Sequence, residues 1–492
     1  MSATLLFTLV IAYFLVLLVV AWITSRNSNN DSFFIGNRNS NWMLVAFGMI
    51  GTSLSGVTFV SVPGTVGSNN FGYLQVVIGY FIGYFIVAYV LLPLYYRLNL
   101  TSIYHYLEQR FGTVAYKTGA LFFIISRTVG ATARLYLVIN VLQLFILDNL
   151  HVPFWLTTFV ILLMILLYTF EGGVKTIVFT DTLQTTFMLA GLVVCIVYIM
   201  SQLDLSLPDA VHALGAKGYT EVFNPDVNSG SFWLKQILGG AFITVGMTGL
   251  DQEMMQKNIS VKNLKDSQKN MITFSTVMVL VNLLFLLLGG LLYVFAESRQ
   301  IGITGDDLFP TIALGYLPPV IAFMFIIGLI SALFPSADGA LTALTSSFCI
   351  DMLGLKKRTD LDERGKKKTR RAVHLTFTVI FFLCVIIFKW IDNKSIINII
   401  LTLAGYTYGP LLGLFAFGIL SRRPVRQGPA TLIVCLAAPV ICYLLAENAA
   451  RWFSGFHIGI ELLILNALIT MAGLWLISVK GEVSAVKKEQ VT

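Results

Sequence analysis

Long apolar runs follow one another along almost the whole of this 492-residue chain, and few charges interrupt them. A helix that crosses a lipid bilayer needs about 20 mostly apolar residues. Charged residues make up only 12% of the chain, against about 25% in a typical soluble domain. We therefore expect an all-α polytopic membrane protein with about 13 transmembrane helices, and not a soluble enzyme or a nucleic-acid-binding protein. The predicted spans are 5–24, 42–66, 71–97, 118–147, 153–170, 177–201, 233–256, 270–296, 318–349, 371–391, 396–420, 428–447 and 457–479.

The lysines and arginines are distributed unevenly between the predicted loops. If the N-terminus lies outside, 25 of the 33 fall in segments that face the cytoplasm, 6 fall outside and 2 lie within the fourth run. Cytoplasmic loops of membrane proteins carry such an excess of Lys and Arg. We predict a multi-pass protein of the cell (inner) membrane, with its N-terminus outside and its C-terminus cytoplasmic. The basic segment 356–371 belongs to this pattern, although it could also bind lipid or a partner.

The second run has glycine, serine and threonine residues at its centre. We expect a helix of this composition to break, and a break frees backbone carbonyls that can coordinate a small cation in a site walled off from lipid. Ser53, Ser55 and Thr58 place hydroxyl groups at the same depth. The alternative interpretation is a small-residue face that packs against a neighbouring helix.

Ionisable side chains within the apolar runs are candidates for function, because they are costly at membrane depth. Arg127 and Arg134 are seven residues apart and share one helix face, so they could bind a carboxylate or form a structural ion pair, for example with Asp181. Asp181 stands among threonines and could hold a hard monovalent cation, or it could cap or pair structurally. Asp251 follows a glycine-containing stretch that suggests a second interrupted helix. It could reach a substrate hydroxyl or be an ordinary interfacial acid.

The ninth run contains Pro335, which leaves the carbonyl of Ser331 without its usual amide donor. Ser336 and Asp338 lie directly beside this defect. A proline kink alone is ordinary in a membrane helix, whereas a kink beside an intramembrane acid and a hydroxyl group is not.

Seven segments, which occur in family order between residues 32 and 420, resemble the sodium:solute symporter family of bacterial sodium/galactose, sodium/proline and sodium/sialic-acid transporters. Any one of them is weakly specific, and together they are specific. They are SFFIGNRN (32–39), the second run, TSIYHYLEQRFG (101–112), EGGVKTIVFTDTLQ (171–184), GLDQEMMQKNIS (249–260), SADGALTALTSSFCID (336–351) and GYTYGPLLGLFAFGIL (405–420).

The resemblance implies a leucine-transporter-type fold, in which five helices are repeated with inverted topology and the first helix of each repeat is interrupted. The solute would bind at mid-membrane between these two helices, and access would alternate as one bundle rocks against the other. The expected organisation is an extra N-terminal helix and linker (1–41), a first repeat (42–201), an exterior loop that could carry a short surface helix (202–232), a second repeat (233–420), and two C-terminal helices with a cytoplasmic tail (421–492).

The family's main sodium site, carried over by alignment, falls on Gly51, Leu54, Ala332, Pro335 and Ser336. The first three would supply backbone carbonyls. Pro335 departs from the family pattern, which usually has serine there, so one hydroxyl ligand is lost. The carbonyl of Ser331 or a water molecule could replace it, or the site could be weak and the coupling ion a proton.

Some family members have a second sodium site, whose acid corresponds to Asp181. Its hydroxyl ligands fall on Asp338 and Gly339, which are not serines. A second sodium ion between two acids and one shared proton are both conceivable, since two close carboxylates rarely both ionise. The sequence therefore leaves the number of coupled ions open.

The sialic-acid branch of the family binds the carboxylate of its substrate with hydroxyls that correspond to Ser53, Ser55 and Thr58, and with an arginine that Arg134 or Arg127 could supply. The sugar-transporting branch has a glutamine at the position of Thr58 and a glutamate at that of Val77. We therefore expect sodium-coupled symport of a small organic solute, first a carboxylated sugar such as a sialic acid. A neutral sugar, a polyol, a monocarboxylate or an amino acid remains an alternative.

Function classes outside symport are less consistent with the sequence. A passive channel needs a continuous polar ring, whereas the polar residues cluster at mid-depth. An enzyme needs a metal or nucleophile constellation, yet no two of the five histidines stand at ligand spacing. We expect no enzyme activity and no cofactor besides the coupling ion Na⁺. The expected partners are the solute and the lipid bilayer, without nucleic acid, and oligomerisation is not required.

Overall fold

The computed structural model describes residues 3–25, 38–391, 396–426 and 428–479. Within these ranges the chain is helical, and its β-structure is limited to the isolated bridges Ser40–Val261 and Val425–Ser478. The helices of the first half are α1 (Ala3–Ser25), α3 (Trp42–Ser53), α4 (Gly56–Asn69), α5 (Tyr73–Ile86), α6 (Leu92–Arg97), α7 (His105–Phe111), α8 (Thr113–Leu142), α9 (Phe154–Gln202) and α10 (Leu207–Ala216). Those of the second half are α11 (Trp233–Thr244), α12 (Gln252–Ile259), α13 (Leu264–Ser298), α14 (Leu308–Gly315), α15 (Pro319–Ser347), α16 (Glu363–Ile391), α17 (Ile396–Leu420), α18 (Ala430–Trp452) and α19 (Leu462–Ile477).

The apolar runs of the sequence coincide with these helices, so the prediction of an all-α membrane protein is confirmed. Among the described residues, eight helices are long and apolar enough to cross a membrane, and the bent pair α3–α4 would make a ninth. Shorter apolar helices lie in α1, in the first part of α9 and in α19. The count of about 13 spans stays a prediction.

Two helices are interrupted where the glycine-containing segments predicted it. α3 and α4 meet at residues 54–55 with a bend of 56°. α11 continues into a π-helical turn (Val245–Gly249) and stops at Leu250, and α12 begins after Asp251. By contrast, α15 continues through Pro335 from Pro319 to Ser347. The proline removes one amide donor there without ending the helix.

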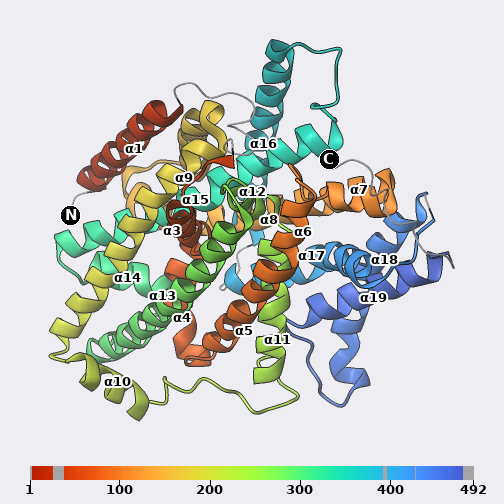
Figure 1. Ribbon diagram of the computed structural model, residues 1–492. Helices are drawn as coiled ribbons and strands as arrows, with labels where there is room; N and C mark the ends of the chain where they lie inside the picture. Colours follow the sequence, from red (N-terminus) through yellow and green to blue (C-terminus); the bar gives the residue numbers. More distant parts are fainter. Residues whose placement is uncertain (1–2, 26–37, 392–395, 427, 480–492) are drawn as a thin grey trace.

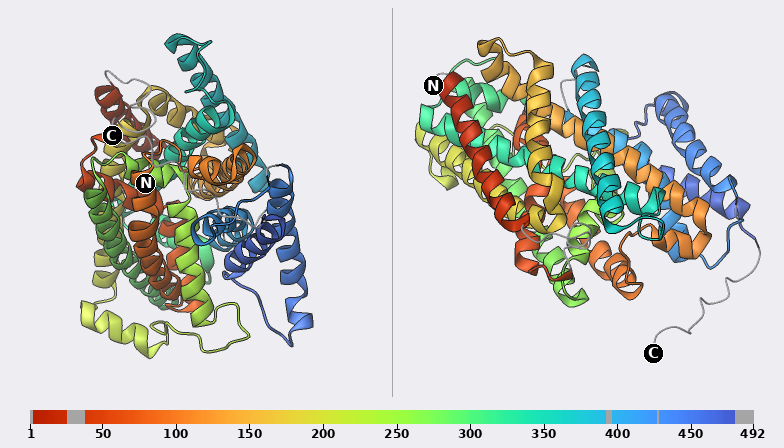
Figure 2. Two further views of the ribbon diagram at one scale, coloured as in Figure 1. Left: turned by 45° about the vertical axis from the view of Figure 1, so that its right-hand side comes forward. Right: turned by 90° about the horizontal axis from the view of Figure 1, so that it is seen from above.

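α15 lies at the centre of the molecule and is buried along nearly its whole length from Phe325 onward. It packs against α9, α8 and α3. α1 lies along α9 on one flank, while α18 and α19 cover α17 on the opposite flank (Figure 1; Figure 2). The short helix α10 lies within the predicted exterior loop, and Ser206 and Asp209 form a capping box at its start.

α5 and α11 approach each other closely through glycines. A methyl group added to Gly79 would lie 2.2 Å from the carbonyl oxygen of Ile237, and one added to Gly240 would lie 2.4 Å from that of Val76. Helix pairs in membranes commonly use small residues for such contacts, because van der Waals packing drives their association.

Candidate functional site

The break between α3 and α4 exposes backbone oxygens inside the protein. Leu54 ends α3, and its amide donates to the carbonyl of Ile50 at 2.7 Å. The carbonyls that follow, from Gly51 to Leu54, accept no backbone amide among the described residues. The last carbonyls of a helix need partners of another kind, and here a cation can serve as that partner.

Gly51 lies against α9 and α15. A methyl group added to it would lie 2.3 Å from Thr185 Oγ1 and 3.6 Å from Pro335 Cγ. Ala332 and Ser336 are buried on α15, and the Ser336 hydroxyl donates to the carbonyl of Leu333 at 2.9 Å, so its lone pairs are available to a cation. The structure thus brings Gly51 and Pro335 close together, whereas their role in binding sodium stays a prediction.

Thr185 was not among the residues that the sequence pointed to. Its hydroxyl is fully buried and has no hydrogen-bond partner among the described residues. The sequence signal was present, since Thr185 follows Asp181 by one helical turn and shares its face. Its contact with Gly51 could not be read from the sequence, because it depends on how closely α3 and α9 pack.

Two connected cavities lie beside the helix break. One, of about 70 Å³, is lined by the predicted residues Ser53, Ser55, Thr58 and Arg134. The other, of about 90 Å³, shares Ser53 and Arg134 with it and extends toward Thr248. Hydroxyl groups and the guanidinium groups of Arg127 and Arg134 therefore converge on this space inside the protein, and Arg134 lines both cavities.

Arg127 and Arg134 have different surroundings although they share a face of α8. The guanidinium of Arg127 is buried, forms an ion pair with Glu253, and approaches Asp251 Oδ2 to 3.9 Å. Arg134 is only partly buried and lies within 4.0 Å of no carboxylate oxygen in the described part of the chain. Both arginines line the cavity of about 90 Å³, but Arg127 is neutralised within the fold, whereas Arg134 also lines the second cavity and has no acid partner among the described residues.

Asp251 lines neither cavity. Its Oδ1 accepts the amides of Glu253 and Met254 at the start of α12, at 2.9 and 3.2 Å. Its Oδ2 accepts the hydroxyl of Tyr408 at 2.8 Å. The structure therefore gives Asp251 a helix-capping and pairing environment.

Asp181 and Asp338 also have partners of their own. Asp181 Oδ2 accepts the Lys257 ammonium at 2.7 Å and the Thr52 hydroxyl at 3.1 Å. Asp338 Oδ2 accepts the hydroxyl of Tyr168 at 2.6 Å. The sequence places Lys257 directly after the predicted span 233–256, in a loop on the cytoplasmic side, because nothing local indicates that it is buried.

Asn282 is a second residue that the sequence did not indicate. It lines the cavity with Ser55 and Arg134, and its amide nitrogen donates to the carbonyl of Met278 at 2.8 Å. Its buried Oδ1 has no partner among the described residues. This oxygen can accept a hydroxyl or an amide N–H from a bound solute.

A larger hollow of about 540 Å³ continues these cavities toward the side that carries the segment 202–232. Tyr73 and Leu401 line both this vestibule and the cavity beside Arg134. The polar residues Ser68, Asn69, Gln236 and Glu447 also face the vestibule. A hydrophilic solute therefore has a polar route from one surface of the protein to the helix break.

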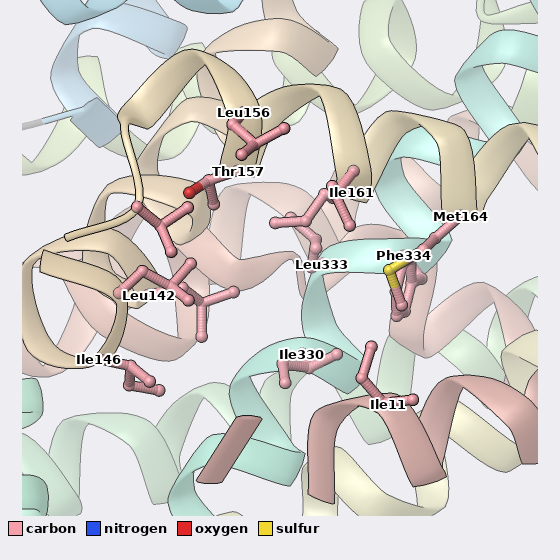
Figure 3. A pocket seen from close by; sticks show the side chains of 13 residues that line it. Ile11, Leu142, Ile146, Leu156, Thr157, Ile161, Met164, Ile330, Leu333 and Phe334 are labelled. Atoms are coloured by element: carbon pink, nitrogen blue, oxygen red, sulfur yellow. The ribbon is translucent and has the colours of Figure 1, made fainter. Parts of the chain in front are cut away.

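A separate cavity of about 220 Å³ lies behind α15 and has a different character (Figure 3). Its walls are aliphatic, with Ile330 and Leu333 from α15 and Ile11 from α1. The hydroxyl of Thr157, the one polar side chain in its lining, donates to Gln143 Oε1 at 2.6 Å. This cavity offers no polar groups to a charged or sugar-like solute.

Comparisons with known proteins agree with this architecture. The chain is 23% identical over 462 residues to the sodium/sialic acid symporter SiaT of Proteus mirabilis, with 90% of this chain and 88% of the relative covered. It is 23% identical over 446 residues to the sodium/sialic acid symporter NanT of Aliivibrio fischeri, with 87% and 85% covered. A solved substrate-bound, outward-open Na⁺-coupled sialic acid symporter has the same fold, with a TM-score of 0.82 over 96% of this chain and 97% of that chain at 20% identity.

A model of the sodium:solute symporter family matches residues 33–433, which is most of the chain. This range contains the two interrupted helices, the cavities beside Arg134 and the Gly51–Pro335 contact. The chain therefore belongs to the sodium:solute symporter family and is a multi-pass, sodium-coupled symporter of a small solute.

Proposed function

We propose that the protein carries a small carboxylated solute, first a carboxylated sugar such as a sialic acid, together with sodium by alternating access. The observation that carries this proposal is Arg134, a cavity-lining guanidinium without an acid partner among the described residues. A cation at this depth is costly unless it is paired. The carboxylate of a bound solute would supply the missing partner through charge-assisted hydrogen bonds.

The rest of the cavity suits a polar solute. Ser53, Ser55 and Thr58 offer hydroxyl groups, and Asn282 offers an acceptor oxygen. A hydroxylated sugar acid would use both kinds of group, whereas a short monocarboxylate would use Arg134 alone. The names of the relatives SiaT and NanT point to the same class of substrate.

The proposed sodium site consists of the carbonyls of Gly51, Leu54 and Ala332 with the hydroxyls of Ser336 and Thr185. Thr185 would replace the hydroxyl that is lost where the family has serine and this chain has Pro335. Sodium prefers oxygen ligands, and carbonyl and hydroxyl oxygens of this kind meet that preference. The unpartnered hydroxyl of Thr185 beside Gly51 supports this assignment over proton coupling.

The proposed architecture has two inverted repeats, residues 42–201 and 233–420. Each begins with an interrupted helix, α3–α4 in the first and α11–α12 in the second. The N-terminus is proposed to lie outside, which puts the vestibule on the exterior face and the tail in the cytoplasm. Solute and sodium would then enter from outside through the vestibule.

A substrate panel tests the proposal. Purified protein in proteoliposomes is assayed for uptake of radiolabelled N-acetylneuraminic acid, galactose, a polyol, a short monocarboxylate and proline, each with and without an inward sodium gradient. We expect sodium-dependent, saturable uptake of the sugar acid, and competition by its carboxylate form but not by its methyl ester. Sodium-dependent uptake of a neutral sugar alone would contradict the role of Arg134.

A further inference from the structure

A buried charged cluster lies between α9 and α12, outside the two cavities that Arg134 lines. It contains Asp181 from α9 and Glu253 and Lys257 from α12, and none of these residues is more than 2% exposed. α12 contacts α3, α9 and α15 in the middle of the bundle (Figure 1). Buried charges are stable only when they are paired and hydrogen-bonded, so the arrangement of this cluster is informative.

Oxygen atoms from three elements surround the Lys257 ammonium. Its Nζ donates to Asp181 Oδ2 at 2.7 Å and to Thr52 Oγ1 at 2.6 Å, and Glu253 Oε1 is 3.6 Å away. Two carboxylates and a hydroxyl are the donor set that a bound alkali cation would use. The ammonium group occupies the position that such a cation would take.

Gly339 of α15 lies against the carboxylate of Glu253. A methyl group added to Gly339 would lie 2.2 Å from Glu253 Oε1, so the glycine makes room for this carboxylate. Asp338 beside it is turned to Tyr168, whose hydroxyl donates to it at 2.6 Å. At these two positions, where some family members have hydroxyl ligands, α15 offers no hydroxyl to a cation at Asp181, and α12 contributes the Lys257 ammonium.

We infer that Lys257 is a built-in cation that fills the binding position at Asp181, so that the protein binds one sodium ion per chain and not two. A sodium ion at Asp181 would have to displace the ammonium or lie beside it, and two adjacent cations repel each other strongly at this depth. Lys257 thus acts as a positioning residue that sets the number of coupled ions. The inference rests on the proposed function only in that the remaining sodium ion binds at the proposed sodium site between Gly51 and Ser336.

The transport cycle would then carry little net charge. One sodium ion with one monocarboxylate sums to zero, whereas two sodium ions would carry one positive charge inward. A membrane potential drives only a cycle that moves net charge. An inside-negative potential would therefore not accelerate uptake of a monoanionic solute.

Equilibrium binding of ²²Na⁺ to the purified full-length protein in nanodiscs, without solute, tests this inference. We expect about one sodium ion per chain in the wild type and in Lys257→Arg, which keeps the cation. In Lys257→Met, which keeps the aliphatic chain and removes the charge, we expect about two. The double variant Lys257→Met/Asp181→Asn should return to one.

The inference would be overturned if the wild-type protein bound two sodium ions per chain. It would also be overturned if the Lys257→Met variant were folded, as judged by gel filtration, and still bound only one sodium ion per chain. If Lys257→Met does not fold, Asp181→Asn decides, because it should keep one sodium ion if Asp181 binds lysine and lose one if Asp181 binds sodium. Wild-type protein that binds no sodium would instead count against the proposed sodium site itself. The failure of the inference and the failure of the proposed function are thus distinguishable.

Discussion

Arg127 and Arg134 show how neighbouring residues of one type acquire different roles. They lie about two turns apart on α8, and the sequence treats them alike. Both line the cavity that contains Ser53, but Glu253 and Asp251 neutralise Arg127, whereas Arg134 has no acid partner among the described residues. The sequence left open whether each of them would bind a carboxylate of the solute or form a structural ion pair, because the partner acids lie more than a hundred residues away.

Replacement of Arg134 by Gln should weaken solute binding with little effect on stability. The loss of a charge-assisted hydrogen bond costs about 1.5–3 kcal/mol, so the Kd of the carboxylated solute should rise by roughly 10- to 100-fold. The matched variant Arg127→Gln removes the guanidinium charge that neutralises two buried carboxylates, and breaking such a buried pair costs about 3–5 kcal/mol. It should lower the melting temperature. Equal effects of both variants on solute Kd would contradict the distinction.

Thr185 gives a second test at the scale of a single side chain. Thr185→Val keeps the shape and removes the hydroxyl that we assign to sodium. Loss of one ligand worth about 1 kcal/mol should raise the sodium concentration for half-maximal binding by about fivefold. The control is Thr186→Val, since Thr186 is exposed and donates to the carbonyl of Thr182. An unchanged sodium affinity in Thr185→Val would remove this residue from the site.

At the scale of helices, the sequence predicted most of what the structure contains. Apolar runs of about 20 residues mark helices because an unpaired backbone is not tolerated in lipid, and the described helices follow those runs. The glycine and serine residues near Ser53 marked the broken helix α3–α4. Pro335 was a weaker signal, because neighbouring helices can support a proline within an unbroken membrane helix.

Gly240 tests the packing of α5 against α11. Gly240→Val places side-chain atoms where the carbonyl of Val76 lies, so the helices must separate. Such overpacking costs about 1–3 kcal/mol and should lower the melting temperature. Gly130→Ala on α8 is the control, because nothing lies within 4 Å of its added methyl group. A thermal unfolding scan of both variants checks this, and equal melting temperatures would contradict the close contact.

For the whole molecule, the vestibule and the ion pairs of α12 lie on opposite sides of the helix break. The polar route passes Tyr73 and ends beside Arg134. The ion pairs of Lys257 with Asp181 and Glu253 lie beyond this end of the route. The positive-inside pattern of the sequence predicts which of these sides faces outward. The connections between the cavities could not be predicted, because they depend on side chains from five or more helices.

Cysteine labelling in intact cells tests this orientation. Asn69 faces the vestibule and Lys262 is exposed in the loop before α13, whereas the native cysteines are buried or partly buried. Asn69→Cys should react with a membrane-impermeant maleimide from outside, and saturating solute with sodium should protect it. Lys262→Cys should react only after permeabilisation. The reverse pattern would place the N-terminus inside.

The central claim is that one pocket at the broken helix α3–α4 captures sodium and solute together. The most direct measurement is the Kd of the solute identified by the uptake panel, determined by calorimetry on purified protein at zero and at saturating sodium. We predict at least tenfold tighter solute binding with sodium, and by linkage an equal gain in sodium affinity when solute is bound. The same solute Kd at both sodium concentrations would contradict the account.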